Sequence, residues 1–308
     1  MFDKKTKEII LEIIQAYDRG ENIVSLAKDK LAIDDKNSLL PILLSYDLQA
    51  GSYNKNKNSS MGLFYDEYGH QLAEIINTYS SSSHNSILEV GCGECTSLSS
   101  ILKYLKDTEL DIFGFDLSWS RIFEGKKILN DNHKKNLFVA DLFSIPLQDN
   151  SMNVVYSSHS LEPNGGMEED AIRELIRVSS DKVILIEPIY ELANDKQKKR
   201  MTKHGYVKNL KSVCESFEVN ILKYDLLPIY SNPLNQSGVI VIEKKDSKNR
   251  NNNSNPWQCP ATGLGLERYN DVFFNNKIGF AYPVLKDIPL LRSEHLIIAS
   301  KINEAVNK

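Results

Sequence analysis

Apolar and polar positions follow a helical pattern through the first eighty residues of the chain. Over 5–17, apolar side chains recur every three or four residues with charged residues between them, which predicts an amphipathic helix. The same spacing predicts three further helices, at about 21–31, 37–48 and 61–79. The polar stretch 51–60 predicts a loop, and the serines at 80–83 predict a linker into the next region.

From residue 86 onward, short apolar runs alternate with amphipathic segments. The apolar runs predict five strands, at 86–91, 110–116, 136–140, 152–157 and 182–187. The amphipathic segments predict four helices, at 96–106, 119–130, 167–178 and 195–212. Two further strands are predicted at 216–226 and 237–244, close enough in sequence to pair antiparallel. This alternation is typical of an α/β fold, in which helices cover both faces of a mostly parallel sheet.

A polar stretch at 244–255 contains no apolar residue and predicts a linker. Beyond it, residues 256–308 are expected to form a small α+β domain. The predicted organisation is therefore an N-terminal helical region over 1–80, an α/β domain over 81–245 and a small C-terminal domain over 256–308. A chain of 308 residues is long enough for such a division.

Charge and cysteine content limit the classes of function. The formal net charge is −4, which argues against a general electrostatic grip on nucleic acid. Four cysteines in 308 residues suggest a reducing compartment rather than a disulfide scaffold. The N-terminus shows no apolar signal core, and no apolar run approaches the length of a membrane span. We therefore expect a cytoplasmic protein with no membrane partner.

The first predicted strand leads into a glycine turn. Apolar residues of 86–90 are followed by Gly91 and Gly93, and a helix begins near Thr96. Glycine lets a ligand approach the backbone, and the free N–H groups at the start of a helix point toward the same place. This strand, turn and helix predict a site for an adenosine-containing cofactor.

Acids and a histidine follow the next predicted strands. Asp116 ends the second strand, Asp141 follows the third and His159 follows the fourth. Ligands of open α/β sheets bind beyond the carboxyl ends of the strands. Asp116 is placed to hold two ribose hydroxyls, and Asp141 to accept a hydrogen bond from an adenine amino group.

The motif Glu89-Val90-Gly91-Cys92-Gly93, with Asp116 and Val139-Ala140-Asp141 in this order, resembles class I S-adenosylmethionine-dependent methyltransferases. The resemblance spans about 60–245 and implies a Rossmann-like, seven-stranded sheet. It also implies S-adenosylmethionine as cofactor and S-adenosylhomocysteine as product. The implied cofactor-binding residues are Glu89, Gly91, Gly93, Asp116, Leu117, Asp141, Leu142 and Ser157. A nicotinamide site would need a third glycine where Thr96 stands.

The segment after the fourth strand is where this family positions its substrate. His159 is the candidate base, because its ordinary pKa suits removal of a proton near neutral pH. Glu162 is a further catalytic candidate, which would orient the substrate. The alternative is that His159 only hydrogen-bonds the strand end or the cofactor. The candidate substrate-binding residues are Asn164, Glu187, Tyr190, His204 and Tyr206. Tyr65 and Tyr68 either close over the cofactor or belong to the core.

We expect no metal site. Cys92 and Cys95 have a Cys-x-x-Cys spacing, but no second pair completes four ligands. Residues 257–266 and 281–291 resemble the small zinc-ribbon-derived domain known as a methyltransferase activator. Cys259 stands alone there, with Thr262 in its partner's position. The resemblance therefore implies a domain that has lost its metal and keeps a structural or substrate-capping role.

Three functions remain open. The first is a methyltransferase that acts on an O or N atom of a small polar metabolite or sugar, favoured by the acidic balance and the polar loops. The second is a methyltransferase that acts on tRNA, rRNA or protein. Against it, the sequence lacks both the basic surface that RNA favours and the Asn/Asp-Pro-Pro-Tyr signature. The third is a non-catalytic protein that binds S-adenosylmethionine. The expected partner is a small molecule rather than nucleic acid, and the oligomeric state stays open.

Overall fold

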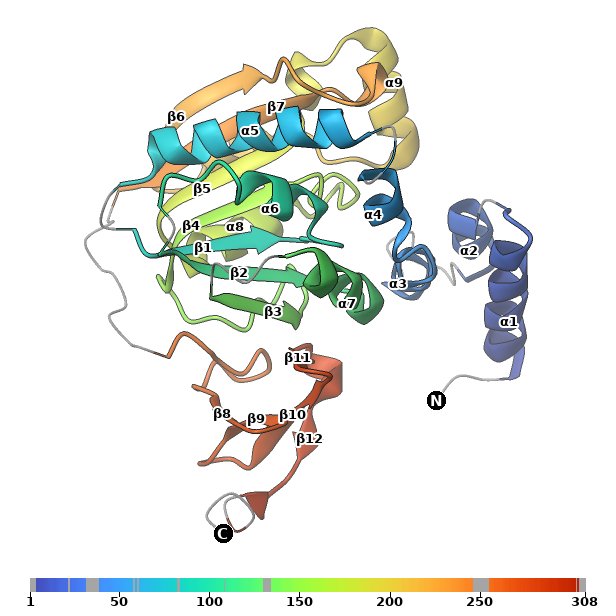
Figure 1. The fold of residues 1–308 in the computed structure, drawn as a ribbon, viewed down its shortest axis with the longest axis vertical. Coiled ribbons are helices and arrows are strands. Elements are labelled where there is room, and N and C mark those ends of the chain that lie inside the picture. Colours follow the sequence, from blue (N-terminus) through green and yellow to red (C-terminus); the bar gives the residue numbers. More distant parts are fainter. Residues whose placement is uncertain are drawn as a thin grey trace.

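A seven-stranded sheet lies at the centre of the computed structural model (Figure 1). Its strand order is β3-β2-β1-β4-β5-β7-β6, and only β7 runs antiparallel to its neighbours. The strands are β1 (Ser86–Val90), β2 (Asp111–Asp116), β3 (Lys135–Val139), β4 (Met152–Ser158), β5 (Ser179–Pro188), β6 (Val219–Leu226) and β7 (Ser237–Lys244). The predicted Rossmann-like, seven-stranded sheet is confirmed. The structure describes residues 4–21, 23–31, 39–57, 59, 61–81, 84–107, 109–129, 134–245, 255–302 and 304.

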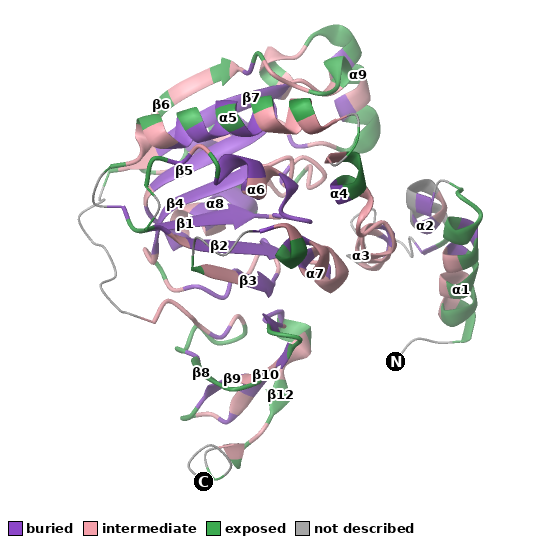
Figure 2. Cartoon of the chain, viewed as in Figure 1, coloured by how far each residue is buried: buried purple, intermediate pink, exposed green. Residues whose placement is uncertain are grey.

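The central strands read as apolar runs because both faces of the sheet are covered, as the burial colours of Figure 2 show. Successive side chains of β1 point to opposite faces. Leu88 and Val90 enter a core shared with α8 (Glu168–Val178) and α10 (Leu210–Glu215). Ile87 enters the other core, shared with α5 (Gly62–Tyr79), α6 (Thr96–Ile101) and α7 (Trp119–Ile128).

The N-terminal helices are α1 (Lys4–Asp18), α2 (Ile23–Leu31), α3 (Leu39–Leu48) and α4 (Ser52–Lys57). Buried residues of α1 and α2 form a small core of their own, against which α3 packs. The predicted loop at 51–60 is wrong for the part that forms α4; residues 58 and 60 lie outside the described residues. The carboxylate of Glu94 accepts hydrogen bonds of 2.9 Å from the N–H groups of Gly51 and Asn54 at the start of α4. A distant side chain therefore stabilises a helix that local propensity does not favour.

The single helix predicted at 195–212 is also wrong, because two helices form there. Helix α9 (Asp195–His204) begins at a capping box on Asn194 and ends at Gly205, which is left-handed with φ 66°. Glycine adopts this conformation without the steric cost that other residues bear, so it ends the helix. The chain turns before α10 starts at Leu210.

A second, antiparallel sheet forms in the C-terminal unit. Its strands are β8 (Glu267–Tyr269), β9 (Val272–Asn275), β10 (Phe280–Leu285), β11 (Ile288–Pro289) and β12 (Ile297–Ile298). The unit lies beside β3, the edge strand of the main sheet (Figure 1). Leu290 forms a parallel bridge with Val139, so the C-terminal unit covers the open edge of β3. Of the predicted linker at 244–255, residues 246–254 lie outside the described residues.

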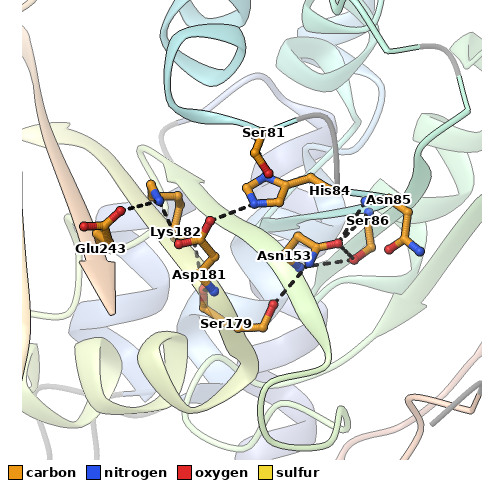
Figure 3. Close-up of polar contacts among 10 residues, drawn as sticks. Ser81, His84, Asn85, Ser86, Asn153, Ser179, Asp181, Lys182 and Glu243 are labelled. Carbon is orange, nitrogen blue, oxygen red and sulfur yellow. Dashed lines mark hydrogen bonds and ion pairs between the residues drawn. The ribbon is translucent and has the colours of Figure 1, made fainter. Parts of the chain in front are cut away.

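A polar network joins β1, β4, β5 and β7 at the end of the sheet opposite the carboxyl ends of β1 and β4 (Figure 3). Asn153 Oδ1 accepts hydrogen bonds from the N–H groups of Asn85 and Ser86. His84 Nε2 lies 2.7 Å from Asp181 Oδ2, and Lys182 joins Asp181 to Glu243. Among the helices that the structure describes, none is long and apolar enough to cross a membrane.

Candidate active site

A cavity of about 550 Å³ opens at the carboxyl ends of the parallel strands. Turns and loops after β1, β2, β3 and β4 line it on one side, and residues of α3, α4 and α5 line it on the other. The tertiary structure brings ten of the predicted site residues to its wall: Glu89, Gly91, Gly93, Asp116, Leu117, Asp141, Leu142, His159, Glu162 and Asn164.

The glycine turn after β1 needs both of its glycines. Gly91 and Gly93 have φ angles of 64° and 54°, a region that favours glycine. A Cβ on Gly91 would lie 2.4 Å from Ser160 Cβ, so the turn packs directly against the loop after β4. The N–H of Gly93 donates a hydrogen bond of 3.0 Å to Asp116 Oδ2. The turn and the acid of β2 are thus fixed to one another.

The two cysteines of the turn are packing residues. Cys92 and Cys95 are buried, with their sulfur atoms 3.8 Å apart and both thiols free. Burial raises the pKa of Cys92 well above its ordinary value, so the thiol stays protonated. No group of three His, Cys, Asp or Glu side chains suited to a metal occurs among the described residues.

Glu89 places a buried carboxyl group at the wall of the cavity. Its exposed fraction is 2%, and burial raises the pKa of Glu89 to about 8. Within the described part of the chain, Glu89 Oε2 has no hydrogen-bond partner. An unsatisfied buried acceptor costs free energy unless a ligand satisfies it. The site therefore fits a ligand that brings a cationic or hydrogen-bond-donating group to Glu89, such as the amino group of a bound amino acid.

Arg121 is a site residue that the sequence analysis missed. Its guanidinium lies 3.8 Å from Asp116 Oδ2 and sits over the rings of Tyr46 and Tyr53, at 5.2 Å and 5.1 Å from their centroids. Such contacts are cation–π interactions. Tyr46 comes from α3 and Tyr53 from α4, and no local pattern in the sequence predicts that these helices reach the turn.

Asp47 of α3 forms hydrogen bonds to the start of α7. Its Oδ1 accepts a hydrogen bond of 2.7 Å from Ser118 Oγ, and its Oδ2 accepts one of 3.0 Å from Ser120 Oγ. Together with Glu94 at the start of α4, this carboxylate holds α3 and α4 over the cavity. The N-terminal helices therefore form one wall of the site.

The loop after β3 is held by the C-terminal unit. Asp141 Oδ1 accepts a hydrogen bond of 2.9 Å from the N–H of Phe143, which shapes the loop beside Leu142. Ser144 Oγ donates to the carbonyl oxygen of Pro260, and the N–H of Gln258 donates to that of Pro146. The segment predicted to meet adenine is therefore braced from outside the α/β sheet.

His159 contacts two partners across the site. Its Nδ1 lies 2.9 Å from Glu162 Oε2, and its Nε2 lies 2.7 Å from Ser237 Oγ. Burial alone would lower the pKa of His159, but the hydrogen bond and charge of Glu162 raise it above its ordinary value. Burial alone would raise the pKa of Glu162. Its hydrogen bonds, above all the one with His159, lower that pKa below its ordinary value. The pair is thus a carboxylate that supports a basic imidazole.

Five predicted residues lie outside the cavity wall: Ser157, Glu187, Tyr190, His204 and Tyr206. Glu187 is fully buried, and its carboxylate accepts hydrogen bonds of 3.1 Å from the N–H groups of Ser160, Leu161 and Glu162. Burial raises its pKa to about 7. This placement makes Glu187 a brace for the loop after β4 rather than a substrate contact.

The other four have different surroundings. Ser157 is fully buried, next to Ser158 of the cavity wall. The ring of Tyr190 is covered by Lys208, whose Nζ is 4.7 Å from its centroid. The ring centroids of His204 and Tyr206 lie 5.7 Å apart, and a hydrogen bond with Tyr206 helps to lower the pKa of Glu162.

Residues 87–182 match a family model described as "Methyltransferase domain". This segment is similar to methyltransferase domains. It contains the glycine turn, Asp116, Asp141, His159 and Glu162, so the enzyme class expected from the sequence is confirmed for this domain. The matched segment begins after α5 and ends before Ser237. Two walls of the cavity, from α3 to α5 and from the residues around Ser237, therefore lie outside it. No curated protein matches the sequence significantly.

Several solved structures are similar to part of this chain at low sequence identity. One is a magnesium protoporphyrin IX methyltransferase from Synechocystis PCC 6803 with bound SAH: 12% identity, TM-score 0.46, covering 62% of this chain and 97% of that chain. Another is the complex between the Haloferax volcanii Trm112 methyltransferase activator and the putative methyltransferase: 11% identity, TM-score 0.47, covering 62% and 94%. A third is a putative sarcosine dimethylglycine methyltransferase from Galdieria sulphuraria: 11% identity, TM-score 0.45, covering 65% and 93%.

Proposed function

We propose that this chain uses S-adenosylmethionine to methylate an O or N atom of a small polar molecule. The observation that carries the proposal is the convergence of Glu89, Asp116 and Asp141 on one cavity around the Gly91 to Gly93 turn. Asp116 would bind the ribose hydroxyls, and the loop of Asp141 and Leu142 the adenine. The Glu89 carboxyl, whose Oε2 has no hydrogen-bond partner among the described residues, would bind the amino group of the methionine part. When bound, S-adenosylmethionine supplies an electrophilic methyl group.

The residues on the remaining wall suit a neutral or cationic substrate. Glu162, Asn164, Asn232 and Asn235 line this side, and they offer hydrogen bonds and one negative charge. Among the described residues of the cavity wall, Arg121 is the one that carries a permanent positive charge, and it is engaged with Asp116 and two tyrosines. A phosphorylated substrate would find little charge to balance its own, so an alcohol, sugar or amine is the better fit.

Binding and transfer can be measured separately. Calorimetry should detect S-adenosylhomocysteine and fail to detect NAD. Transfer of a radiolabelled methyl group should then occur to one of three small probes: ethanolamine, glucosamine or catechol. Absence of S-adenosylhomocysteine binding would overturn the cofactor assignment. Binding without transfer to any probe would favour a non-catalytic binding protein or a macromolecular substrate, which methyl transfer to total tRNA or to protein would reveal.

We further propose that the C-terminal unit is a metal-free counterpart of the methyltransferase-activator domain. Cys259, the one cysteine of the unit, is buried with its sulfur 3.2 Å from the hydroxyl of Tyr282. The contacts of the C-terminal unit to the loop after β3 support a role in holding the proposed adenine-binding segment. Metal analysis of the purified protein tests whether the unit is free of metal, and one equivalent of tightly bound zinc would contradict this proposal.

A further inference from the structure

Both ring nitrogens of His159 are occupied. Glu162 is a carboxylate, which only accepts hydrogen bonds, so the hydrogen of the neutral ring lies on Nδ1 and is donated to Glu162 Oε2 over 2.9 Å. The other nitrogen, Nε2, is then an acceptor. Ser237 Oγ lies 2.7 Å from it and must be the donor. His159 therefore has no lone pair left for the proton of a substrate.

A second donor besides His159 keeps Glu162 in the role of a hydrogen-bond acceptor. Asn235 donates a hydrogen bond of 3.1 Å from Nδ2 to Glu162 Oε2. Asn235 is itself oriented by Arg200, whose Nη1 donates to Asn235 Oδ1 over 2.6 Å. The amide of Asn235 cannot turn over without losing both bonds, so the direction of every bond from Arg200 to His159 is fixed.

Ser237 brings this chain of hydrogen bonds to the cavity. It is the first residue of β7, and its carbonyl oxygen accepts a hydrogen bond of 2.8 Å from the N–H of Leu227. It lines the cavity beside Tyr68, whose hydroxyl lies 3.3 Å from Ser158 Oγ. With its proton directed at His159, Ser237 Oγ has two lone pairs, and Tyr68 is a hydrogen-bond partner for one of them. The other can accept a hydrogen bond from a substrate O–H or N–H at the cavity wall.

We propose that Glu162, His159 and Ser237 form a proton relay in which Ser237 Oγ, and not the imidazole, is the group that takes the proton of the substrate. The inference rests on the proposed function. The O–H or N–H bond of the substrate breaks, and its proton passes to Ser237 Oγ while the Ser237 proton passes to His159 Nε2. The electron pair of the broken bond stays on the substrate atom, which becomes the nucleophile. His159 ends as an imidazolium beside the Glu162 carboxylate.

Charged groups on three elements face His159 and set the pH at which the relay is ready. Glu162 on its own loop and Glu187 on β5 raise the pKa of His159, and Arg200 on α9 lowers it. The relay needs neutral His159, so turnover should rise as pH increases through the pKa of His159. Glu162→Gln removes the largest of the raising effects and should move this rise to lower pH.

Nitrogen-15 spectra of histidine-labelled protein test the hydrogen bonds without a substrate. The sequence contains six histidines, and His159→Gln assigns the signals of His159. We expect an unprotonated Nε2 that shifts in Ser237→Ala and stays unchanged in Ser212→Ala, a matched change on α10. Identical Nε2 signals in the wild type and in Ser237→Ala would overturn the relay. These spectra are recorded on the free protein, so they decide the relay even if S-adenosylhomocysteine does not bind.

Turnover with the most active of ethanolamine, glucosamine and catechol tests the catalytic step. Ser237→Ala should lower kcat by about 10²-fold or more, as loss of general base catalysis does. Its Kd for S-adenosylhomocysteine should stay within about twofold of the wild type, because Ser237 is not among the residues proposed to bind it. A kcat within about threefold of the wild type would assign the proton to another acceptor and overturn the proposal.

Discussion

The main-chain N–H of Leu291 donates a hydrogen bond of 2.8 Å to the carbonyl oxygen of Val139, across 152 positions of sequence. Val139 ends β3, and Asp141 follows two residues later. The C-terminal unit therefore does more than cover an open strand edge. It holds the main chain from which the proposed adenine-binding segment starts.

Leu291→Ala should loosen that segment. Leu291 is fully buried, and loss of a buried leucine side chain costs about 2–5 kcal/mol of unfolding free energy. Hydrogen exchange should become faster in residues 140–148, and S-adenosylhomocysteine should bind more weakly. Leu264→Ala is the control, because Leu264 belongs to the same unit and is 39% exposed. Unchanged exchange in residues 140–148 would show that the loop does not depend on this contact.

Glu89→Gln should affect stability in a pH-dependent way. The pKa of Glu89 is raised from its ordinary 4.5 to about 8, so the unfolded chain loses this proton at lower pH than the folded protein. The stability of the wild type therefore falls as pH rises from about 4.5 to 8. The neutral amide avoids this loss, so the variant should be more stable by on the order of 3 kcal/mol at pH 8 and similar at pH 4.5.

The same variant should bind S-adenosylhomocysteine about tenfold more weakly at pH 8, because it lacks the charge proposed to face the amino group. Thermal unfolding at the two pH values and calorimetry give both quantities. Equal unfolding temperatures of variant and wild type at pH 8 would mean that Glu89 is already satisfied in the free protein.

Asp116→Ala should weaken cofactor binding and stability together. The carboxylate accepts hydrogen bonds from Gly93 and Ser118 and lies beside the guanidinium of Arg121. Without it, two buried N–H groups lose their acceptor, at a cost of about 1–3 kcal/mol each. We expect S-adenosylhomocysteine to bind at least tenfold more weakly. Asp111→Ala, at the exposed start of the same strand, is the control and should bind it as the wild type does.

Asp181→Ala should destabilise the protein without changing the site. Asp181 joins His84 to Lys182 in the network of Figure 3, at the far end of the sheet. Its removal should lower the unfolding free energy by about 1–3 kcal/mol and leave the Kd for S-adenosylhomocysteine within about twofold. Asp149→Ala breaks an ion pair whose aspartate is 68% exposed, and should cost less than about 1 kcal/mol. A loss of affinity in Asp181→Ala would show that the two ends of the sheet are coupled.

The sequence by itself determined the sheet and the line of residues along its carboxyl edge. Apolar runs predict buried strands, and two glycines directly after such a run predict a turn. The structure agrees, with φ angles near 60° at both glycines. Because the carboxyl ends of parallel strands share one edge, Glu89, Asp116, Asp141 and His159 had to meet there. These are local patterns and elementary geometry, which a sequence carries directly.

Only the tertiary structure decided what covers that edge and which side chains meet at the site. Arg121 meets Tyr46 and Tyr53, and Ser237 meets His159, through contacts between segments far apart in the sequence. Glu187 looked like a site residue because it lies at the end of a strand, yet it is fully buried and its carboxylate braces the loop after β4. Such roles depend on side-chain directions and on packing between distant elements, and neither has a local signature in the sequence.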